Sequence, residues 1–261
     1  MREIKSIEEI HKILLSIANA FAEVCDKNNI PYCMIGGTML GAIRHKGFIP
    51  WDDDMDFGVY SEHYCQLKKI LEKELPSPYK CISFENCESV KYPFFKIEDD
   101  STRVLDKTVN LPLEAMTGLN IDIFPLFPCN GNNWEVRRLN PLKKLTTLLY
   151  VESDKDCLYK KIIRWILRFT IRMDKKKWLQ FLYRKADSLK GAYRGNLFGR
   201  WREREIFPEE VYQNLEEYNF ETIKLKGIKQ ADRYLRQMYG DYMKLPTKDK
   251  QLTHISNVYW K

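Results

Sequence analysis

The apolar positions in the first third of the chain predict two amphipathic helices. Residues 7–24 place apolar side chains three and four positions apart, and Ser6 with Glu9 forms a capping box at the start. Residues 61–75 repeat this spacing up to Pro76, which stops a helix. We expect the first helix to pack on a sheet and the second to lie on the surface. The apolar positions are Ile7, Ile10, Leu14, Ile17, Phe21 and Val24, and then Tyr64, Leu67, Leu71 and Leu75.

Two strands are expected between these helices. Residues 33–35 form a short apolar run, a glycine pair follows, and residues 38–45 have the composition of a short helix. Met55, Phe57 and Val59 are apolar at every second position, which is the period of a strand. The segment therefore predicts a strand, a tight turn, a helix and a second strand.

Three more strands are expected in the middle of the chain. Residues 92–105 predict two short strands around an acidic turn, with Lys96 in the first and Arg103 in the second. Residues 120–126 predict an apolar strand that contains Asp122, and we expect Pro125 to end it.

The second half of the chain is predicted to be largely helical. From Pro141 the composition shifts to Leu, Ile, Trp, Lys and Arg, and near the C-terminus a short strand, residues 223–225, precedes a helix through Tyr234, Leu235 and Met238. Together these elements predict an α/β (α+β) fold, with a mixed sheet flanked by helices and a helical subdomain in the second half.

Composition places this chain among globular proteins and favours anionic partners. Hydrophobic residues make up 44% and aromatic residues 13% of 261 residues, which supplies an ample core and excludes global disorder. The formal charge of +7 favours nucleotide phosphates, nucleic acid or anionic lipid headgroups without choosing among them. The first twelve residues lack the apolar core of a signal peptide, so we expect a cytoplasmic protein. Seven scattered cysteines without a CxxC pair are expected to be reduced thiols rather than zinc ligands.

Four aspartates within five residues are the chemical centre of the sequence. Asp52, Asp53, Asp54 and Asp56 repel one another unless a cation or a set of donors compensates them. Residues of equal parity share one face of a strand, so Asp52, Asp54 and Asp56 are expected to point one way. Asp53 would join the apolar side chains on the other face, where we expect it to meet water or to cap a neighbour. Three carboxylates on one face suit a hard divalent cation, and Mg²⁺ (or Mn²⁺) is the cofactor we expect.

The glycine pair before this cluster has a phosphate-binding interpretation and a structural one. A strand, Gly36, Gly37 and a helix N-terminus can bring backbone amides close to a phosphate. The same residues can also form no more than a tight turn. The acidic strand that follows favours the functional interpretation.

These motifs together resemble the LicD family, the phosphocholine transferases of the nucleotidyltransferase-fold superfamily, related to fukutin. The resemblance is carried by GGTMLGAIRHKGFIPWDDDMDF and extends to IDIFPL at residues 121–126 and to YGDYMKLP and His254 near the end of the chain. The superfamily pattern is a glycine pair followed by Asp, an apolar residue, Asp and an apolar residue, which falls here on residues 36–37 and 54–57. The resemblance implies a nucleotidyltransferase-like core over residues 1–140. A helical and C-terminal region, residues 141–261, would complete the substrate pocket within one compact unit.

The resemblance also implies roles for individual residues. Asp54, Asp56 and Asp122 would be catalytic and would hold the metal, although Asp122 could instead pair with an arginine. Lys96 would bind phosphate, although a lysine on a strand is more often solvated. The residues expected to bind substrate are Asp52, Gly36, Gly37, Thr38, Arg44 and Lys96.

The implied activity is metal-dependent transfer of a phospho-headgroup, most simply phosphocholine from CDP-choline, to a hydroxyl of a cell-surface glycan precursor. Teichoic acid, lipopolysaccharide or capsule precursors, free or lipid-linked, would be the acceptors. Other CDP-linked donors with ethanolamine, glycerol or ribitol, and nucleotidyl transfer to a protein acceptor, are the alternatives.

Two non-catalytic interpretations of the aspartates fit the sequence less well. A structural calcium loop that starts at Asp52 would need glycine where Phe57 stands and glutamate where His63 stands, so we do not expect one. The non-enzyme alternative, a lipid- or nucleic-acid-binding module, would leave the aspartates unexplained. No nucleic-acid motif accompanies the positive charge, so we expect no nucleic-acid partner.

A basic amphipathic helix is predicted within residues 162–173. Such a helix can lie on an anionic membrane, which would place the protein at the inner face of the cell membrane, or it can pack on the core with its basic rim in water. Its apolar positions are Ile162, Trp165, Ile166, Phe169 and Met173, edged by Lys160, Lys161, Arg164, Arg168 and Arg172.

Overall fold

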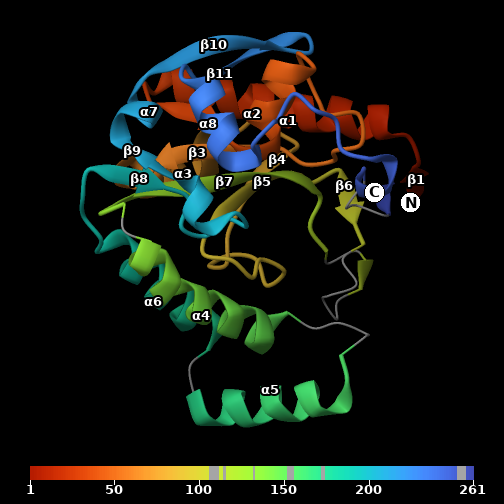
Figure 1. Ribbon diagram of the computed structural model, residues 1–261. Coiled ribbons are helices and arrows are strands. Elements are labelled where there is room, and N and C mark those ends of the chain that lie inside the picture. Colours follow the sequence, from red (N-terminus) through yellow and green to blue (C-terminus); the bar gives the residue numbers. More distant parts are fainter. Residues whose placement is uncertain (106–111, 114–115, 132, 152–155, 172–173, 252–256) are drawn as a thin grey trace.

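A mixed sheet of nine strands forms the centre of the molecule (Figure 1). The computed structural model describes residues 1–105, 112–113, 116–131, 133–151, 156–171, 174–251 and 257–261. The strands follow one another across the sheet as β10 (Leu215–Phe220), β11 (Ile223–Ile228), β2 (Tyr32–Met34), β3 (Asp56–Tyr60), β7 (Leu119–Cys129), β5 (Phe95–Asp99) and β4 (Tyr79–Ile82). The last residues of β7, from Phe127 to Cys129, pair with β8 (Tyr193–Gly195), and β8 pairs in turn with β9 (Ile206–Pro208). This confirms the predicted fold class.

Eight α-helices flank the sheet within the described ranges. They are α1 (Ile7–Lys27), α2 (Gly36–Arg44), α3 (Ser61–Glu74), α4 (Asn133–Tyr150), α5 (Leu158–Ile171), α6 (Lys175–Asp187), α7 (Glu209–Gln213) and α8 (Ala231–Tyr239). The same ranges contain the short 3-10 turns η2 (Arg202–Glu205), between β8 and β9, and η3 (Lys248–Lys250), after α8. The helices expected over residues 7–24 and 61–75 are confirmed as α1 and α3.

The parallel pair β3 and β7 organises the site face of the sheet. Its register sets Asp56 directly opposite Asp122. On the other face, Phe21 of α1 packs against Phe57, with ring centroids 5.1 Å apart. Because side chains alternate along a strand, the burial of Phe57 beneath α1 directs Asp56 to the opposite face.

Strand β7 continues through Pro125, so the prediction that this proline ends the strand is wrong. The Asp122 amide donates to the carbonyl of Met55, the residue before β3 (2.9 Å), and amides alternate in direction along a strand. The nitrogen of Pro125 therefore faces away from β3. On that side, β5 pairs with β7 only up to Ile123 and β8 begins at Phe127, so no ladder bond is lost.

The second half of the chain adds both helices and strands. Helices α4, α5 and α6 lie together below the sheet in Figure 1, with α5 farthest from it. Pro141 lies inside α4, so residues 140 and 141 belong to one helix. Strands β8 to β11 join the same sheet as the N-terminal strands.

The two ends of the described chain meet in a small second sheet. Strand β12 (Val258–Trp260) pairs with both β1 (Arg2–Ile4) and β6 (Thr102–Val104). Ser6 caps α1 by accepting from the Glu9 amide (3.3 Å). The Glu9 carboxylate does not complete the capping box and instead accepts from Arg2 (2.7 Å) and the Trp260 indole (3.0 Å).

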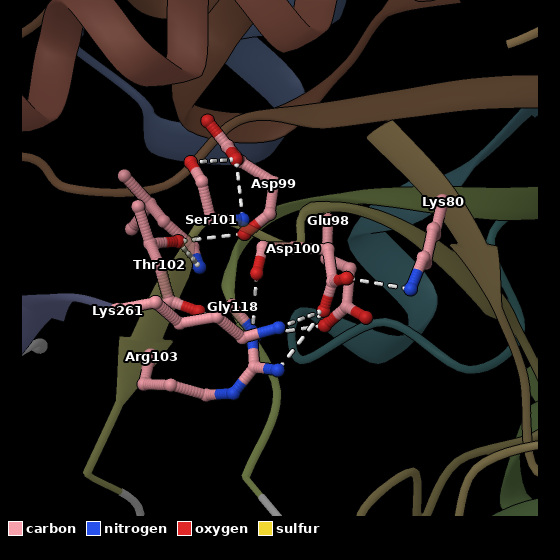
Figure 2. Close-up of polar contacts among 10 residues, drawn as sticks. Lys80, Glu98, Asp99, Asp100, Ser101, Thr102, Arg103, Gly118 and Lys261 are labelled. Carbon is pink, nitrogen blue, oxygen red and sulfur yellow. Dashed lines mark hydrogen bonds and ion pairs between the residues drawn. The ribbon is translucent and has the colours of Figure 1, made fainter. Parts of the chain in front are cut away.

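Asp100 is the centre of a charged cluster that holds this C-terminal strand (Figure 2). Its carboxylate contacts Lys80 (2.5 Å), Arg103 (2.9 Å) and Lys261 (2.8 Å). Burial works against the ionised form, but the bonds from Lys261, Lys80 and Arg103 outweigh it and lower the pKa of Asp100. The cluster therefore ties both β4 and the turn before β6 to the last residue of the chain.

Replacing Asp100→Asn is expected to lower the free energy of unfolding by about 1–2 kcal/mol at neutral pH. Because the folded pKa is depressed, this stabilisation is present above the unfolded pKa of about 3.9 and is lost as the pH falls through the folded value. Urea unfolding at pH 7 and at pH 3 measures the difference. Glu217→Gln, which removes an exposed pair with Lys224 at 3.6 Å, is the control and should change little. Equal effects of Asp100→Asn at both pH values would contradict this assignment.

Candidate functional site

The acidic segment approaches the sheet with the alternation that its sequence predicts. Strand pairing begins only at Asp56, yet Asp53 and Met55 are buried while Asp54 is exposed. Asp53 thus joins the buried side, as predicted, but it is fully buried, so the expectation that it meets water is wrong. The segment is fixed from α1 by His11, whose ring nitrogen Nε2 donates to the Asp52 carbonyl (2.7 Å).

The glycine pair forms the first turn of α2 and lies directly against the carboxylates. A Cβ atom on Gly37 would come within 2.8 Å of Asp52 Oδ2, and one on Gly36 within 3.2 Å of Asp56 Oδ2. Gly36 has a φ of +55°, which disfavours any residue with a side chain. Thr38, also in this turn, accepts from the Asp56 amide (2.8 Å). The glycines are therefore required for the close approach of α2 to the acidic segment.

Lys96 and Asp122 form an ion pair beside Asp56. Strand β5 places Lys96 opposite Asp122, and Lys96 Nζ lies 2.5 Å from Asp122 Oδ1 and 3.1 Å from Asn120 Oδ1. About a fifth of each charged side chain remains exposed, 22% for both Lys96 and Asp122. The partner of Asp122 is thus a lysine rather than an arginine, and Lys96 is not simply solvated.

Burial and mutual repulsion raise the pKa values of the carboxyl groups. Burial first and Asp54 next, which also hydrogen-bonds it, raise the pKa of Asp52 to about 8. Burial, then Asp54 and Asp122, raise the pKa of Asp56 well above its usual range. Burial opposes the charge of Lys96, but Asp122 outweighs it and raises the pKa of the ammonium. The cluster thus has more negative charge than Lys96 alone compensates.

The C-terminal half contributes three side chains around this cluster, of which Tyr239 belongs to the YGDYMKLP motif and Glu205 is not identified by any sequence pattern. The Tyr239 hydroxyl lies 3.9 Å from the Cβ position of Gly36, and burial and then Asp56 raise its pKa. Glu205, at the end of η2, is 5% exposed, and burial raises its pKa to about 7. Its charge in turn contributes to the raised pKa of Asp56. Tyr234 of α8 accepts from the Gly36 amide (2.9 Å).

Arg44 and the chain end are placed differently from the aspartates. Arg44 donates to the Tyr242 carbonyl (2.7 Å) and to His45 Nε2 (2.9 Å), which directs it to the segment after α8. Asp241 follows the end of α8 and is exposed. His254 lies outside the described residues.

The donor chemistry of the cluster fits a hard divalent cation. Asp54, Asp56 and Asp122 offer only oxygen atoms, and Asp56 is a crowded carboxyl whose ionised form needs a nearby positive charge. Within the described ranges, no three Asp, Glu, His or Cys side chains are gathered tightly enough to hold one ion by themselves. Magnesium in phosphoryl-transfer sites commonly uses one or two carboxylates together with substrate phosphate and water.

A cavity of about 440 Å³ adjoins Lys96 on the same face of the sheet. Phe124, two residues after Asp122 on β7, forms its wall together with Phe94, with ring centroids 4.3 Å apart. Lys96 Nζ lies 5.8 Å from the centre of the Phe94 ring. Tyr92, Lys143, Lys144 and Arg200 also line the cavity. The cavity thus combines aromatic faces with basic side chains next to the ion pair.

In the part of the chain that the structure describes, every helix is too short or too polar to cross a bilayer.

The sequence of this chain is similar to a known domain family and to several known proteins. The sequence profile of the LicD/FKTN/FKRP nucleotidyltransferase domain matches residues 29–145, which include Asp54, Asp56, Lys96 and Asp122. The lipopolysaccharide cholinephosphotransferase LicD of Haemophilus influenzae is 26% identical over 262 residues, covering 95% of this chain and 96% of that protein. An uncharacterised protein of Rickettsia typhi is 32% identical over 126 residues, 42% of this chain and 40% of that protein. The human ribitol 5-phosphate transferase FKRP is 27% identical over 120 residues, 46% of this chain and 21% of that protein.

Proposed function

We propose that this chain, which carries a nucleotidyltransferase domain of the LicD family, transfers phosphocholine from CDP-choline to a hydroxyl of a cell-surface glycan precursor. The similarity to a lipopolysaccharide cholinephosphotransferase over 95% of this chain supports both the headgroup and the acceptor class. The seven free thiols support a reducing, cytoplasmic site of action.

The observation that carries the proposal is the meeting of four elements around one cluster. Asp56 and Asp122 lie opposite each other on β3 and β7, Lys96 pairs with Asp122, and Gly36 and Gly37 lie against the carboxylates. Excess negative charge, a lysine and a helix N-terminus in one place suit the cation-assisted binding of a diphosphate.

The chemistry is a displacement at the β-phosphorus of the donor. The acceptor oxygen bonds to this phosphorus, the bond from phosphorus to the bridging oxygen breaks, and CMP leaves with that oxygen. Asp122 orients the acceptor hydroxyl and takes its proton, while Lys96 donates to a phosphate oxygen. A magnesium or manganese ion held by Asp54 and Asp56, with Asp122, would neutralise charge on the diphosphate. The remaining contribution of the protein is positioning, which supplies much of the rate in phosphoryl transfer.

The cavity beside Lys96 is the proposed acceptor site. It opens on the face that presents Asp122, the side chain assigned to the acceptor hydroxyl. Aromatic faces such as those of Phe94 and Phe124 suit sugar rings, and Lys144 and Arg200 suit anionic substituents of the glycan.

A panel of CDP-linked donors tests this function. The protein is incubated with CDP-choline, CDP-ethanolamine, CDP-glycerol or CDP-ribitol, with and without magnesium, and CMP release is measured. We expect the highest turnover with CDP-choline in the presence of magnesium and background rates after chelation. Preference for CDP-ribitol would instead favour the activity named for the human relative. Absence of turnover with every donor would contradict a transferase that uses CDP-linked donors.

A further inference from the structure

Helix α5 is fastened to the body of the protein by one face. Arg164 is buried, and its guanidinium donates to two carbonyl groups at the end of α4 and to the carboxylate of Asp156 (2.6 Å). Arg168 donates to the Leu149 carbonyl from the same side (2.6 and 2.9 Å). Leu167 and Ile171 pack toward the core next to these arginines. The roll of the helix about its own axis is therefore fixed by hydrogen bonds.

The opposite face of α5 is apolar and exposed. Leu158 is 73%, Trp165 70% and Phe169 65% exposed, and the two aromatic rings stack 6.2 Å apart. A helix on a protein surface normally turns its polar residues to the solvent, and α5 does the reverse. Other exposed apolar side chains on this helix are Tyr159, Ile162, Ile163 and Ile166. A contiguous surface of this kind marks a binding site.

The charge around this apolar face is positive. Residues 158–171 contain four basic side chains and no acidic one. Lys160 and Lys161 are exposed, although Lys160 also lies 3.8 Å from the Asp156 carboxylate. Arg164 is taken up by its contacts with α4, so the basic rim is narrower than the sequence predicts. Arg172 and Met173, which the sequence adds to this helix, lie outside the described residues.

We propose that α5 lies on the surface of an anionic lipid bilayer, with Trp165 and Phe169 inserted at the level of the headgroups and the lysines above the phosphates. Helices that lie in the interface of a membrane are typically amphipathic, with aromatic and aliphatic residues on one face and lysines beside them. Helix α5 forms the outer edge of the molecule in Figure 1, so a flat surface reaches it without meeting other elements. Charge complementarity to anionic headgroups favours lipid over a second copy of this basic chain. This inference does not depend on the proposed reaction.

Co-sedimentation with vesicles tests the proposal on the full chain. Wild-type protein is mixed at low salt with vesicles of phosphatidylcholine that contain phosphatidylglycerol. We expect binding that weakens as salt is added, and at least about a tenfold weaker association for the double variant Trp165→Glu, Phe169→Glu. The affinity of the variant Lys160→Gln, Lys161→Gln for anionic vesicles is expected to fall about fivefold per lysine, while its affinity for pure phosphatidylcholine vesicles should change little.

Matched controls keep these outcomes decisive. Phe181→Glu alters an exposed apolar side chain on α6, 42% exposed, and should bind vesicles like the wild type. CMP release from a soluble donor and thermal unfolding should be unchanged in all these variants, which separates this proposal from the proposed function. Failure of the wild type to bind anionic vesicles, or equal binding by the Trp165→Glu, Phe169→Glu variant, would overturn it. A dimer in solution that this double variant dissociates would assign α5 to self-association and would overturn it as well.

Discussion

Asp56→Asn is expected to lower turnover of the CDP-linked donor at least about a thousandfold. Asp56 lies against the glycine turn of α2 and opposite Asp122, so it adjoins both the helix N-terminus and a second proposed metal ligand. An amide of the same shape removes the negative charge and leaves the packing in place. In metal-free buffer we therefore expect the variant to be as stable as the wild type or slightly more stable, because a repulsive group has been removed.

Steady-state CMP release and thermal unfolding measure the two effects of Asp56→Asn separately. Asp26→Asn, an exposed carboxylate paired with Lys226 at the end of α1, serves as the control and should retain full turnover. Asp54→Asn is expected to behave like Asp56→Asn. Near-normal turnover in either of these two variants would remove the proposed metal site, and a large loss of stability would indicate a structural role instead.

Lys96→Ala is expected to weaken donor binding about 10- to 150-fold, the equivalent of one charge-assisted hydrogen bond of about 1.5–3 kcal/mol. Lys96 is the cation that the structure places next to Asp122 and Asp56, so its removal increases the repulsion that an incoming diphosphate meets. Thermal stability should change less than binding, because 22% of the Asp122 side chain is exposed and water can hydrogen-bond its carboxylate once the ammonium is removed.

Lys68→Ala provides a matched control for Lys96→Ala. Lys68 has a similar side-chain exposure, 18% against 22%, and pairs with Glu85 rather than with a carboxylate of the cluster. Calorimetric titration with CDP-choline should give the wild-type affinity for Lys68→Ala. Equal donor affinities for Lys96→Ala and the wild type would limit Lys96 to a structural ion pair with Asp122.

Local patterns in the sequence predicted the half of the site that is built from contiguous segments. The alternation around Asp54 and Asp56 depends only on the period of a strand, and the turn at Gly36 depends only on the chemistry of glycine, so both are visible without a structure. The pairing of Lys96 with Asp122 required knowledge of which strands are neighbours. A resemblance to a family could suggest both residues, but it could not give their contact.

The remaining features depend on tertiary contacts that no local pattern records. Glu205 belongs to the run RERE, which is typical of a solvated turn, and its burial against the site follows from the packing of η2 between α4 and α8. Pro125 breaks strands in general, yet here its nitrogen falls where β7 has no partner on that side. Trp165 points outward because Arg164, on the buried side of α5, donates hydrogen bonds to carbonyl groups at the end of α4. The helical periodicity alone cannot show this contact.

The products formed from CDP-choline show which of its two phosphorus atoms the acceptor attacks. The protein is incubated with CDP-choline, magnesium and a glycan-precursor extract, and the products are identified by mass spectrometry. Attack at the β-phosphorus predicts free CMP, together with a glycan that gains the mass of phosphocholine. Free phosphocholine together with a cytidylyl group on the acceptor or on the protein would show attack at the α-phosphorus, and would contradict the account in favour of nucleotidyl transfer.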